Sequence, residues 1–571
     1  MLKIKNTILL VFLIGFYINS NAQNNRILLD GSFDDWSDKP DHFEDPSGDG
    51  RFGFDFENLI MDNDEQFLFL SFDIGIEINL QDQNEVVLYL DTDDDPQTGY
   101  VYDGIGAEII YFFGDRSGYF YKNNTQKSIE HRHLGLSTLP TVSSNRFEIC
   151  MDRNILINND LVFPGNTVRA ILLHDVQNGD KLPDGPGGVK FKFSDDPLTE
   201  MPKYTLAGSN SSDFRFLSYN VLFDELFDKQ AQFRRQIAAI DPDIIAFQEI
   251  YDHSAEQTKD LVEDFLGGSW YAAKQGSDII MISKYPILES HYIKGNGGFL
   301  IDVNGQQILV INAHLPCCSN DSGRQEEVDA IMAFIRKSKN GETSLNLQEN
   351  TPIIIAGDMN FVGKNRQIRT FIEGDINNEA VYGADFAPDW DGSDFKDILS
   401  FATNTPLALT WYDLESSYNP GRLDYIIYSD AVLQVKNAFN LFSQFLPVDS
   451  LQHYGILKDD TKNASDHIPV VADFVFGSTS AVQALQSEVD KMVDVYPNPF
   501  SKTVRIRLKK DIKGVIPIQI LDQTGKLVLE NMIDADLSPE IILQTETMAP
   551  GLYYLMFEIN GRKYPVQLSK I

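Results

Sequence analysis

Cysteine and positive charge are the two features that this sequence has least of. Three cysteines in 571 residues cannot form a disulfide framework, so the fold must be held by hydrophobic cores and by any bound ions. The 47 Lys and Arg residues are outnumbered by 84 Asp and Glu residues, which gives a formal charge of −37. This balance argues against a protein that holds nucleic acid through a broad basic surface, but not against an enzyme that meets phosphate only at a metal site.

Long apolar runs are also scarce, and the one that is present lies near the start of the sequence. Lys3 and Lys5 precede an apolar run over residues 8–18, and small residues follow up to Ala22. A basic segment, an apolar segment of about ten residues and a small-residue exit predict a secretory signal peptide over residues 1–22. A membrane span needs about 20 apolar residues, so we expect an exported protein without a transmembrane segment.

Length and strand patterning indicate several domains. At roughly 100–200 residues per domain, the chain corresponds to about three to five of them. Residues 26–195 contain short strands and turns but no long amphipathic helix, which predicts an antiparallel β-sandwich. Strands alternate with helices over residues 212–476, which predicts an α/β domain. A polar linker is expected over residues 477–493, and residues 494–571 again have an all-β pattern.

Polar side chains stand at the ends of five apolar runs in the α/β segment. If these runs are strands that share sheets, their ends form one rim. Carboxylates and amides suit a hard cation such as Mg²⁺, and imidazoles suit proton transfer or phosphate contacts. Packing does not explain so many polar groups at strand ends, so the pattern predicts a functional site. Its members are Asn220, Gln248-Glu249, Asn312–His314, Asp358–Asn360 and Asp466-His467.

The motifs around these positions resemble those of the endonuclease/exonuclease/phosphatase superfamily, whose fold is that of DNase I. One motif alone is weak, but six in family order over about 260 residues are specific. The resemblance implies a four-layer α/β sandwich, so we expect a multidomain chain in which this DNase I-like domain is flanked by two all-β sandwiches. The six motifs are Ser218-Tyr219-Asn220, Gln248-Glu249, Asn312-Ala313-His314-Leu315, Gly357-Asp358-Met359-Asn360, Arg422-Leu423-Asp424-Tyr425 and Ser465-Asp466-His467.

The resemblance also implies a metal site and a set of catalytic roles. Glu249, assisted by Asn220, is expected to be the principal ligand of Mg²⁺ or Mn²⁺. Asp466 is expected to contact a second metal or a water molecule. These metal-ligating groups would neutralise the charge that develops on a phosphodiester during hydrolysis.

The catalytic roles fall on the remaining members of the rim. Asp358 is expected to orient the attacking water and to help deprotonate it, and Asn360 to hold a phosphate oxygen. His467 is expected to contact the phosphate and to transfer protons, with Asp424 fixing its tautomer, since a His held by a carboxylate is a suitable acid–base group near neutral pH. His314 is the second imidazole of the rim.

Arg324 is a further candidate for binding the substrate. Apolar residues recur at helical spacing over residues 324–337, which predicts a helix that begins close behind His314. Because a helix N-terminus favours an anion, Arg324 is expected to contact the phosphate.

The branch of the superfamily, and with it the substrate, stays open between alternatives. AP endonucleases typically have Tyr where this chain has His314, and the 5-phosphatase signature is absent from residues 418–424. A sphingomyelinase-like enzyme should have an apolar membrane-docking hairpin, for which residues 442–447 are a weak candidate. We therefore rank an extracellular nuclease or general phosphodiesterase first and a sphingomyelinase-like or phospholipase C-like enzyme second. A surface-binding protein with a degenerate catalytic domain is the non-enzymatic alternative.

The N-terminal segment resembles family 9-type carbohydrate-binding and DOMON-like sandwiches. The resemblance rests on Leu29-Asp30-Gly31, Asp34-Asp35-Trp36 and the stretch from Leu90 to Tyr100. Asp91, Asp93 and Asp95 alternate along one loop, which suits Ca²⁺, although an Asp-rich hairpin turn would have the same composition. A surface polysaccharide is the candidate ligand that such a fold suggests, but the fold by itself does not assign one.

The C-terminal segment resembles the type A sorting domain of the type IX secretion system. The matching stretches are Tyr496-Pro497-Asn498-Pro499-Phe500, Leu521–Lys526 and Ala549–Tyr553. The resemblance implies that the secretion machinery is a partner and that the protein is secreted or held at the cell surface. The alternative is an ordinary terminal β-sandwich.

The three cysteines fall at two places. Cys317 and Cys318 are adjacent and follow His314 closely. A disulfide between them and a soft-metal site are the two functional alternatives. We favour small, partly buried side chains at these two positions, and a core position for Cys150.

Overall fold

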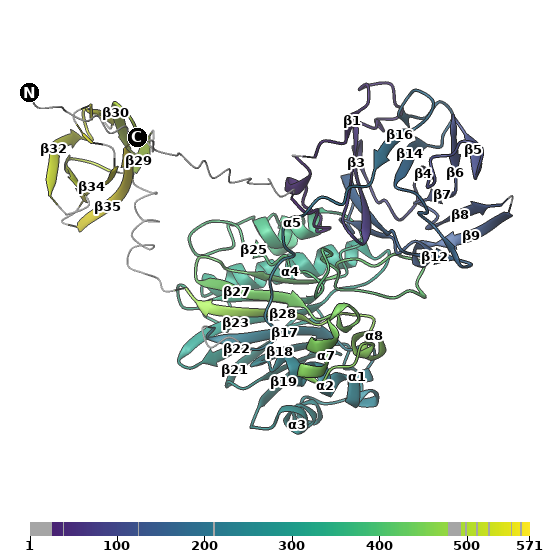
Figure 1. The fold of residues 1–571 in the computed structure, drawn as a ribbon. Coiled ribbons are helices and arrows are strands. Elements are labelled where there is room, and N and C mark those ends of the chain that lie inside the picture. Colours follow the sequence, from purple (N-terminus) through teal and green to yellow (C-terminus); the bar gives the residue numbers. More distant parts are fainter. Residues whose placement is uncertain are drawn as a thin grey trace, which may run out of the picture.

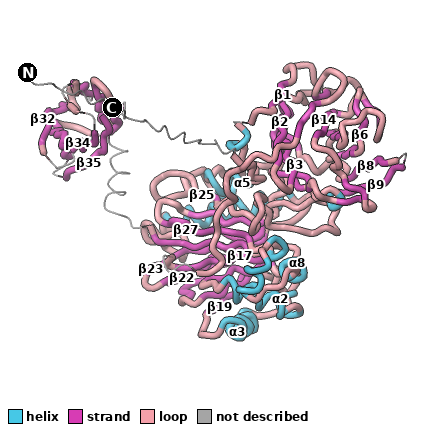
Figure 2. The backbone as a smooth tube through the Cα atoms, in the orientation of Figure 1, coloured by secondary structure: helices cyan, strands magenta, loops and turns pink. Residues whose placement is uncertain are grey.

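The computed structural model describes residues 25–477, except 38, 124 and 209–211, and most of residues 493–570. The predicted signal peptide and nearly all of the predicted linker over 477–493 lie outside the described residues. An N-terminal, a central and a C-terminal body follow one another along the chain (Figure 1). Strands dominate all three, and the longer helices belong to the central one (Figure 2). None of the described helices is long and apolar enough to cross a membrane.

The N-terminal domain consists of two antiparallel sheets that pack face to face, as the strand pattern predicts. The first sheet contains β1 (His42–Glu44), β2 (Asn58–Asn63), β3 (Phe67–Ile78), β11 (Ser144–Asp152) and β10 (Ser137–Leu139), in that order. The second has the order β15 (Lys181–Leu182), β14 (Thr167–His174), β4 (Val86–Asp91), β7 (Ile109–Phe112), β8 (Ser117–Lys122) and β9 (Thr125–Glu130), with β16 (Val189–Lys192) paired to β14. Shorter elements are the hairpins β5–β6 (Tyr100–Tyr102, Ile105–Ala107) and β12–β13 (Leu156–Ile157, Asp160–Leu161), and the turns η1 (Asp34–Trp36) and η2 (His131–His133).

The first half of β3, residues 67–72, is buried on both faces of its sheet. Leu68, Leu70 and Phe72 point into the core between the two sheets. Phe67 and Phe69, on the opposite face, join a second apolar cluster that includes residues of the central domain. Because successive side chains of a strand point to opposite faces, the run reads as continuously apolar rather than alternating.

The central domain is built on two six-stranded sheets. The first has the order β19 (Tyr271–Gln275), β20 (Ile279–Ser283), β18 (Ile244–Gln248), β17 (Phe214–Asn220), β28 (Val470–Phe476) and β27 (Leu433–Asn440). The second has the order β21 (Ile287–Ile293), β22 (Asn296–Val303), β23 (Gln306–His314), β24 (Ile353–Asp358), β26 (Asp424–Tyr428) and β25 (Lys396–Asp397). The helices are α1 (Glu225–Asp228), α2 (Gln230–Ile240), α3 (Ala255–Leu266), α4 (Asp321–Lys339), α5 (Arg366–Glu373), α6 (Glu379–Tyr382), α7 (Val448–Tyr454) and α8 (Asp460–Ala464), with the turn η3 (Ser443–Phe445).

The alternation of side chains along the strands explains the four layers. Phe216 and Val310 lie in the cluster between the two sheets. Leu217 faces outward onto α2 and α3, whereas Leu309 and Ile311 face outward onto α4 and α5. Each sheet is therefore covered by the other sheet on one face and by helices on the opposite face. This is the DNase I-like α/β sandwich that the motifs imply.

The N-terminal and central domains share a continuous interface. Leu29 exchanges main-chain hydrogen bonds with Pro406 and Ala408 of the central domain, and Trp36 is buried in the shared apolar cluster. Thr141 also lies in this interface, where its hydroxyl contacts the main-chain oxygens of Phe361, at 2.7 Å, and Arg422, at 3.2 Å. The N-terminal sandwich is thus attached to loops that adjoin the rim of the central domain.

The C-terminal domain has two small sheets around its own core. One has the order β29 (Val493–Tyr496), β30 (Thr503–Leu508) and β33 (Glu540–Gln544). The other has the order β32 (Leu527–Asp534), β31 (Val515–Asp522), β34 (Gly551–Ile559) and β35 (Arg562–Lys570). The expected all-β sandwich is confirmed, while parts of the sorting motifs, residues 497–499 and 523–525 among them, lie outside the described residues.

Candidate active site

The strand register brings the predicted rim residues together. In the second sheet His314 pairs with Asp358, and Asp358 pairs with Asp424, so three functional side chains lie side by side on neighbouring strands. In the first sheet Asn220 pairs with Gln248, directly before Glu249. The two sheets are joined below the rim by a buried hydrogen bond of 2.7 Å between the amides of Gln248 and Asn312.

Glu249 and Asp358 form the acidic side of the site. The Nδ2 of Asn220 donates to Oε1 of Glu249 at 2.9 Å and to Oδ2 of Asp358 at 3.0 Å. The main-chain N–H of Phe223 donates to Oε2 of Glu249 at 2.9 Å. One ligand atom each from Glu249, His314 and Asp358 lies within 4.8 Å of the others. Two carboxylates held this closely, with one neutral amide between them, form a donor set that fits a hard divalent cation.

His314 is held by a carboxylate that the sequence reasoning did not identify. Its Nδ1 lies 2.6 Å from Oδ2 of Asp278, and its Nε2 lies 3.7 Å from Asp358 and 3.8 Å from Glu249. Burial alone would lower the pKa of His314, but the hydrogen bond to Asp278 and the charges of Asp358 and Glu249 outweigh it and raise this pKa to about 9. Asp278 could have been found, because it directly precedes the antiparallel strand β20, which starts at the edge where the parallel strands end.

His467 forms the second imidazole–carboxylate pair. Its Nδ1 lies 2.8 Å from Oδ2 of Asp424, as expected, and its Nε2 lies 3.5 Å from Oδ2 of Asp358. Burial would lower the pKa of His467, but the charges of Asp424 and Asp358 outweigh burial and raise it. The two imidazoles therefore approach Asp358 from two sides, each with its other nitrogen fixed by a carboxylate.

Asn360 anchors Asp358 in addition to lying beside it. Its main-chain N–H donates to Oδ1 of Asp358 at 3.0 Å. Its Nδ2 donates to Oδ2 of Asp358 at 3.1 Å and to the carbonyl of Leu315 at 3.0 Å. The phosphate contact expected of Asn360 stays a prediction, and it would require the amide to exchange one of these bonds.

Asp466 lies next to His467 but belongs to none of the four clusters of potential metal ligands in the described part of the chain. Its Oδ2 accepts a hydrogen bond of 3.0 Å from the indole N–H of Trp411. Its predicted metal or catalytic role stays a prediction.

The expectation that Arg324 contacts phosphate is not supported. Helix α4 begins at Asp321, three residues earlier than predicted, so Arg324 lies one turn inside it and is completely buried. Its guanidinium donates to the carbonyls of Pro316 and Cys318, at 2.8 and 2.9 Å. It also donates to the side chains of Asp321, at 2.6 Å, and Gln367, at 3.2 Å. Arg324 fastens the loop that follows His314 instead of facing the rim.

Two other sequence expectations are corrected. Cys317 and Cys318 are exposed and joined to each other by a disulfide, because they lie in the surface loop between β23 and α4 and not in a core. Cys150 is buried, as predicted.

Asp95 is exposed and does not join the predicted calcium-binding carboxylates. Asp91 and Asp93 meet Glu108 instead.

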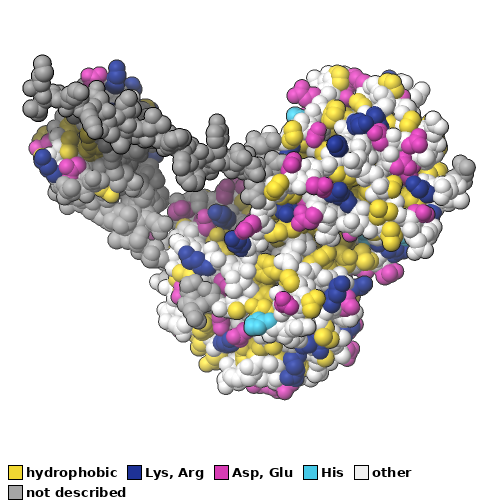
Figure 3. Space-filling view, in the orientation of Figure 1, with side chains coloured by type: hydrophobic (Ala, Val, Ile, Leu, Met, Phe, Trp, Pro, Cys, Tyr) yellow, Lys and Arg dark blue, Asp and Glu magenta, His cyan; other side chains and the backbone are white. Residues whose placement is uncertain are grey.

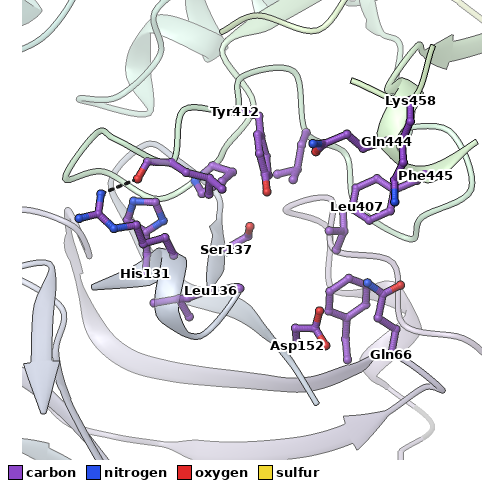
Figure 4. Close-up of a pocket in the computed structure, with 16 residues that line it drawn as sticks. Gln66, His131, Leu136, Ser137, Asp152, Leu407, Tyr412, Gln444, Phe445 and Lys458 are labelled. Atoms are coloured by element: carbon purple, nitrogen blue, oxygen red, sulfur yellow. Dashed lines mark hydrogen bonds between the residues drawn. The ribbon is translucent and has the colours of Figure 1, made fainter. Parts of the chain in front are cut away.

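A cavity of about 320 Å³ opens between the N-terminal and central domains (Figure 4). His131, Ser137 and Asp152 line it from the N-terminal sandwich, and Tyr412 and Phe445 line it from the central domain. None of the rim carboxylates or imidazoles described above is among its lining residues. The cavity therefore belongs to the domain interface and not to the candidate active site.

Comparisons with known proteins agree with the fold. Residues 217–467 match the Endonuclease/Exonuclease/phosphatase family, and residues 494–569 match the Secretion system C-terminal sorting domain. No curated protein matches the chain. Members of the first family depend on divalent metal ions, and a sorting domain of this kind implies the type IX secretion machinery.

Several solved structures are similar to part of the chain. Three of them each cover 46% of the full chain. The human Nocturnin catalytic domain with bound sulfate is 18% identical over 94% of its own length, with a TM-score of 0.29. Sphingomyelinase C from Streptomyces griseocarneus is 17% identical over 98%, with a TM-score of 0.29. TDP2 from D. rerio, complexed with a single-stranded DNA product, is 16% identical over 98%, with a TM-score of 0.31. By the family matches, residues 217–467 form an endonuclease/exonuclease/phosphatase family domain, which lies ahead of a secretion system C-terminal sorting domain.

Proposed function

We propose that the protein is a secreted, divalent-metal-dependent phosphodiester hydrolase of the extracellular endonuclease type. The observation that carries the proposal is the convergence of two imidazole–carboxylate pairs, His314–Asp278 and His467–Asp424, on the single buried carboxylate of Asp358. A diester hydrolase needs a group that positions water, a group that handles the leaving proton, and positive charge around the phosphate. This arrangement provides candidates for each of these roles.

Glu249 and Asn220 are the residues that would hold Mg²⁺ or Mn²⁺. Both are buried at the rim, and carboxylate and amide oxygens are the ligand type that these ions prefer. Asn220 would have to turn its Oδ1, which accepts from the N–H of Leu222, toward the ion. When bound, such an ion supplies positive charge to a phosphate oxygen and to the charge that develops there during hydrolysis.

The protein's own groups would divide the remaining work. Asp358, fixed by amide donors from Asn220 and Asn360, is placed to accept a proton from a water molecule at its Oδ2. His467 keeps a proton on Nδ1 toward Asp424, so its Nε2 is directed to the same space and can donate to a phosphate or leaving-group oxygen. His314, held in the same way by Asp278, presents a second Nε2 at 3.7 Å from Asp358.

An exposed aromatic pair beside Glu249 supports a nucleic-acid substrate. Phe223 is 69% exposed and Tyr251 is 38% exposed, and their rings stack with centroids 5.8 Å apart. Because every base has a π-face, such a platform binds bases without reading their sequence. Acidic and basic side chains are interspersed on the face shown in Figure 3, which suits a substrate that is held mainly at the metal site.

The sphingomyelinase alternative loses its docking candidate in the structure. Phe442 and Leu446 of the 442–447 segment are buried, and Phe442 packs in the interface with the N-terminal domain. An apolar hairpin that enters a membrane must be exposed. We therefore keep the nuclease ranking and include the lipid only as an outcome of the test.

The sorting domain supports export by type IX secretion, and release or surface attachment after it. An extracellular location is consistent with a nuclease or phosphodiesterase that acts on material outside the cell.

The test is an activity panel on the chain from residue 25 onward. Double-stranded DNA, RNA, sphingomyelin liposomes and a phosphomonoester are each incubated with Mg²⁺, Mn²⁺ or EDTA. We expect EDTA-sensitive cleavage of DNA or RNA that is lost in Asp358→Asn and retained in Asp264→Asn, a control in an exposed ion pair on α3. Cleavage of sphingomyelin alone would assign the phospholipase branch, and hydrolysis of the monoester alone would make the enzyme a phosphatase. Inactivity on the whole panel by a folded protein would favour the binding-protein alternative.

A further inference from the structure

Three carboxylates of the N-terminal sandwich meet at one end of the sheet that contains β4 and β7. Asp91 is the last residue of β4, and Glu108 directly precedes β7. Leu90 pairs with Ile109 in this antiparallel ladder, so Asp91 and Glu108 occupy the next facing positions. Asp93 follows in the loop, and one oxygen from each of the three carboxylates lies within 4.8 Å of the others.

This placement is unfavourable without a cation. Like charges directly opposite each other on neighbouring strands are destabilising, and both Asp91 and Glu108 are 0% exposed. Burial raises the pKa of Asp91, and burial together with the charge of Asp93 raises that of Glu108 to about 7. The basic group nearest to the cluster in the described part of the chain is Lys122, whose Nζ lies 3.5 Å from the outer oxygen of Asp93.

One oxygen of the cluster has no partner among the described residues. Oε2 of Glu108 accepts a hydrogen bond of 2.9 Å from the main-chain N–H of Thr92. Oε1 of Glu108 is buried and accepts none. A buried carboxylate oxygen without a donor is costly, so this atom points to a positively charged ligand that is shared with Asp91 and Asp93.

The loop that follows Asp91 packs closely against Gly106 of the β5–β6 hairpin. The N–H of Gly106 donates to Oδ2 of Asp91 at 3.2 Å. A Cβ on Gly106 would lie 2.4 Å from the carbonyl oxygen of Asp95 and 2.3 Å from that of Thr98, so both carbonyls fold back over this glycine. Asp94 turns away from the cluster and pairs with Arg169 and Lys190.

We propose that Asp91, Asp93 and Glu108 bind a Ca²⁺ ion that fastens the loop over residues 92–99 to the sandwich. Ca²⁺ takes six to eight oxygen ligands at about 2.3–2.6 Å, so two ligands on opposite sides of one ion lie up to about 5 Å apart, in keeping with this cluster. The three donors are all carboxylate oxygens, which Ca²⁺ prefers. The ion would have a structural role, because its ligands join the loop before the β5–β6 hairpin to the ends of β4 and β7. The site is independent of the function proposed for the central domain.

The test counts calcium on the metal-free chain from residue 25 onward. Equilibrium dialysis with radioactive Ca²⁺ gives the number of ions bound, and thermal unfolding is followed in Ca²⁺, Mg²⁺ or EDTA. We expect Glu108→Gln to bind one Ca²⁺ fewer than the wild type and to lose most of the Ca²⁺-dependent rise in unfolding temperature. In EDTA the variant should unfold at the same temperature or higher, because it lacks one of the facing buried charges.

A matched control separates this site from other acidic groups. Asp94→Asn removes a carboxylate from the same loop but not from the cluster, so it should keep the wild-type number of ions. Ions bound elsewhere cancel in the comparison. Equal calcium counts for the wild type and Glu108→Gln would overturn the proposal, as would a rise in unfolding temperature that Mg²⁺ produces equally well.

Discussion

At the scale of single residues, Asp358 is the centre of the candidate site, because both imidazoles and both neighbouring asparagines contact its carboxylate. Three N–H groups, from Asn220 and from the main chain and side chain of Asn360, donate to its two oxygens. Its Oδ2 faces both imidazoles within 3.7 Å. A carboxylate held in this way keeps one orientation without rearrangement, which is what a group that positions water requires.

Replacing Asp424 by Asn should separate orientation from structure. The amide keeps the size of the carboxylate, but it can donate to Nδ1 of His467 and so stabilise the wrong tautomer. We expect kcat on the diester to fall by about 10²–10⁴-fold with little change in KM. Steady-state kinetics measures the effect, and circular dichroism melting checks that the fold survives. A change confined to KM would mean that the pair binds substrate without handling protons.

Arg324 provides a second prediction at this scale. Arg324→Lys keeps the charge but cannot satisfy Gln367, Asp321 and both loop carbonyls at once. Leaving buried acceptors without donors costs about 1–3 kcal/mol, so the free energy of unfolding in urea should fall by that amount. The KM of the folded variant should match that of the wild type, whereas a large rise in KM at unchanged stability would restore the substrate role.

At the scale of secondary-structure elements, a buried ion pair joins two neighbouring strands of the first central sheet. Arg215 on β17 and Asp473 on β28 are bound at 2.6 Å, and both are almost completely buried. The same guanidinium donates to the carbonyls of Leu206 and Ile240. It thereby attaches the segment before β17 and the end of α2 to the sheet.

Breaking this pair from one side should be costly. Asp473→Ala leaves the guanidinium buried without its counter-ion, and the expected loss is about 3–5 kcal/mol in the free energy of unfolding. The exposed pair Arg234–Asp264 is the matched control, and Asp264→Ala should cost less than about 1 kcal/mol. Urea titrations of both variants measure the two losses in the free energy of unfolding. Similar losses would contradict the prediction that the buried pair contributes more to stability than the exposed pair.

The element scale also explains what could be predicted from the sequence. Strand-end motifs such as Gly357-Asp358-Met359-Asn360 are local, so the rim and the fold class could be predicted from the pattern of runs. Asp278 carries a weaker signal, its place directly before β20, because its contact with His314 joins two different sheets. Glu108 carries no signal of its own, because it meets Asp91 only through the pairing of β4 with β7. Arg324 was misplaced because the first turn of α4, Asp321 to Gly323, has no apolar residue to mark the helix start.

At the scale of the whole molecule, the N-terminal and central domains behave as one unit. Their shared cluster contains Trp36 and Phe69 from one domain and Leu407 and Phe442 from the other, all nearly inaccessible to solvent. Interfaces between independent domains are usually more polar than this. The central domain is therefore not expected to keep its full stability alone.

Removing residues 25–211 tests whether the central domain depends on the N-terminal domain for its stability. The truncated chain would expose Leu407, Ala408 and Phe442, and we expect a lower unfolding temperature and concentration-dependent association. Scanning calorimetry and light scattering measure the two effects. A chain that ends at residue 477 retains the interface and is the control. An unchanged unfolding temperature after the N-terminal truncation would contradict the prediction.

The hydroxyl of Thr141 has a consequence for how such a protein can diverge. It contacts the main-chain oxygens of Phe361, directly after Asn360, and of Arg422, two residues before Asp424, so one side chain of the first domain is matched to two loops of the candidate site. A recombination event that brought in a foreign N-terminal sandwich would have to supply an equivalent hydroxyl at this point. We therefore expect the two domains to be inherited together and to change in step, with residue 141 among the positions that vary least.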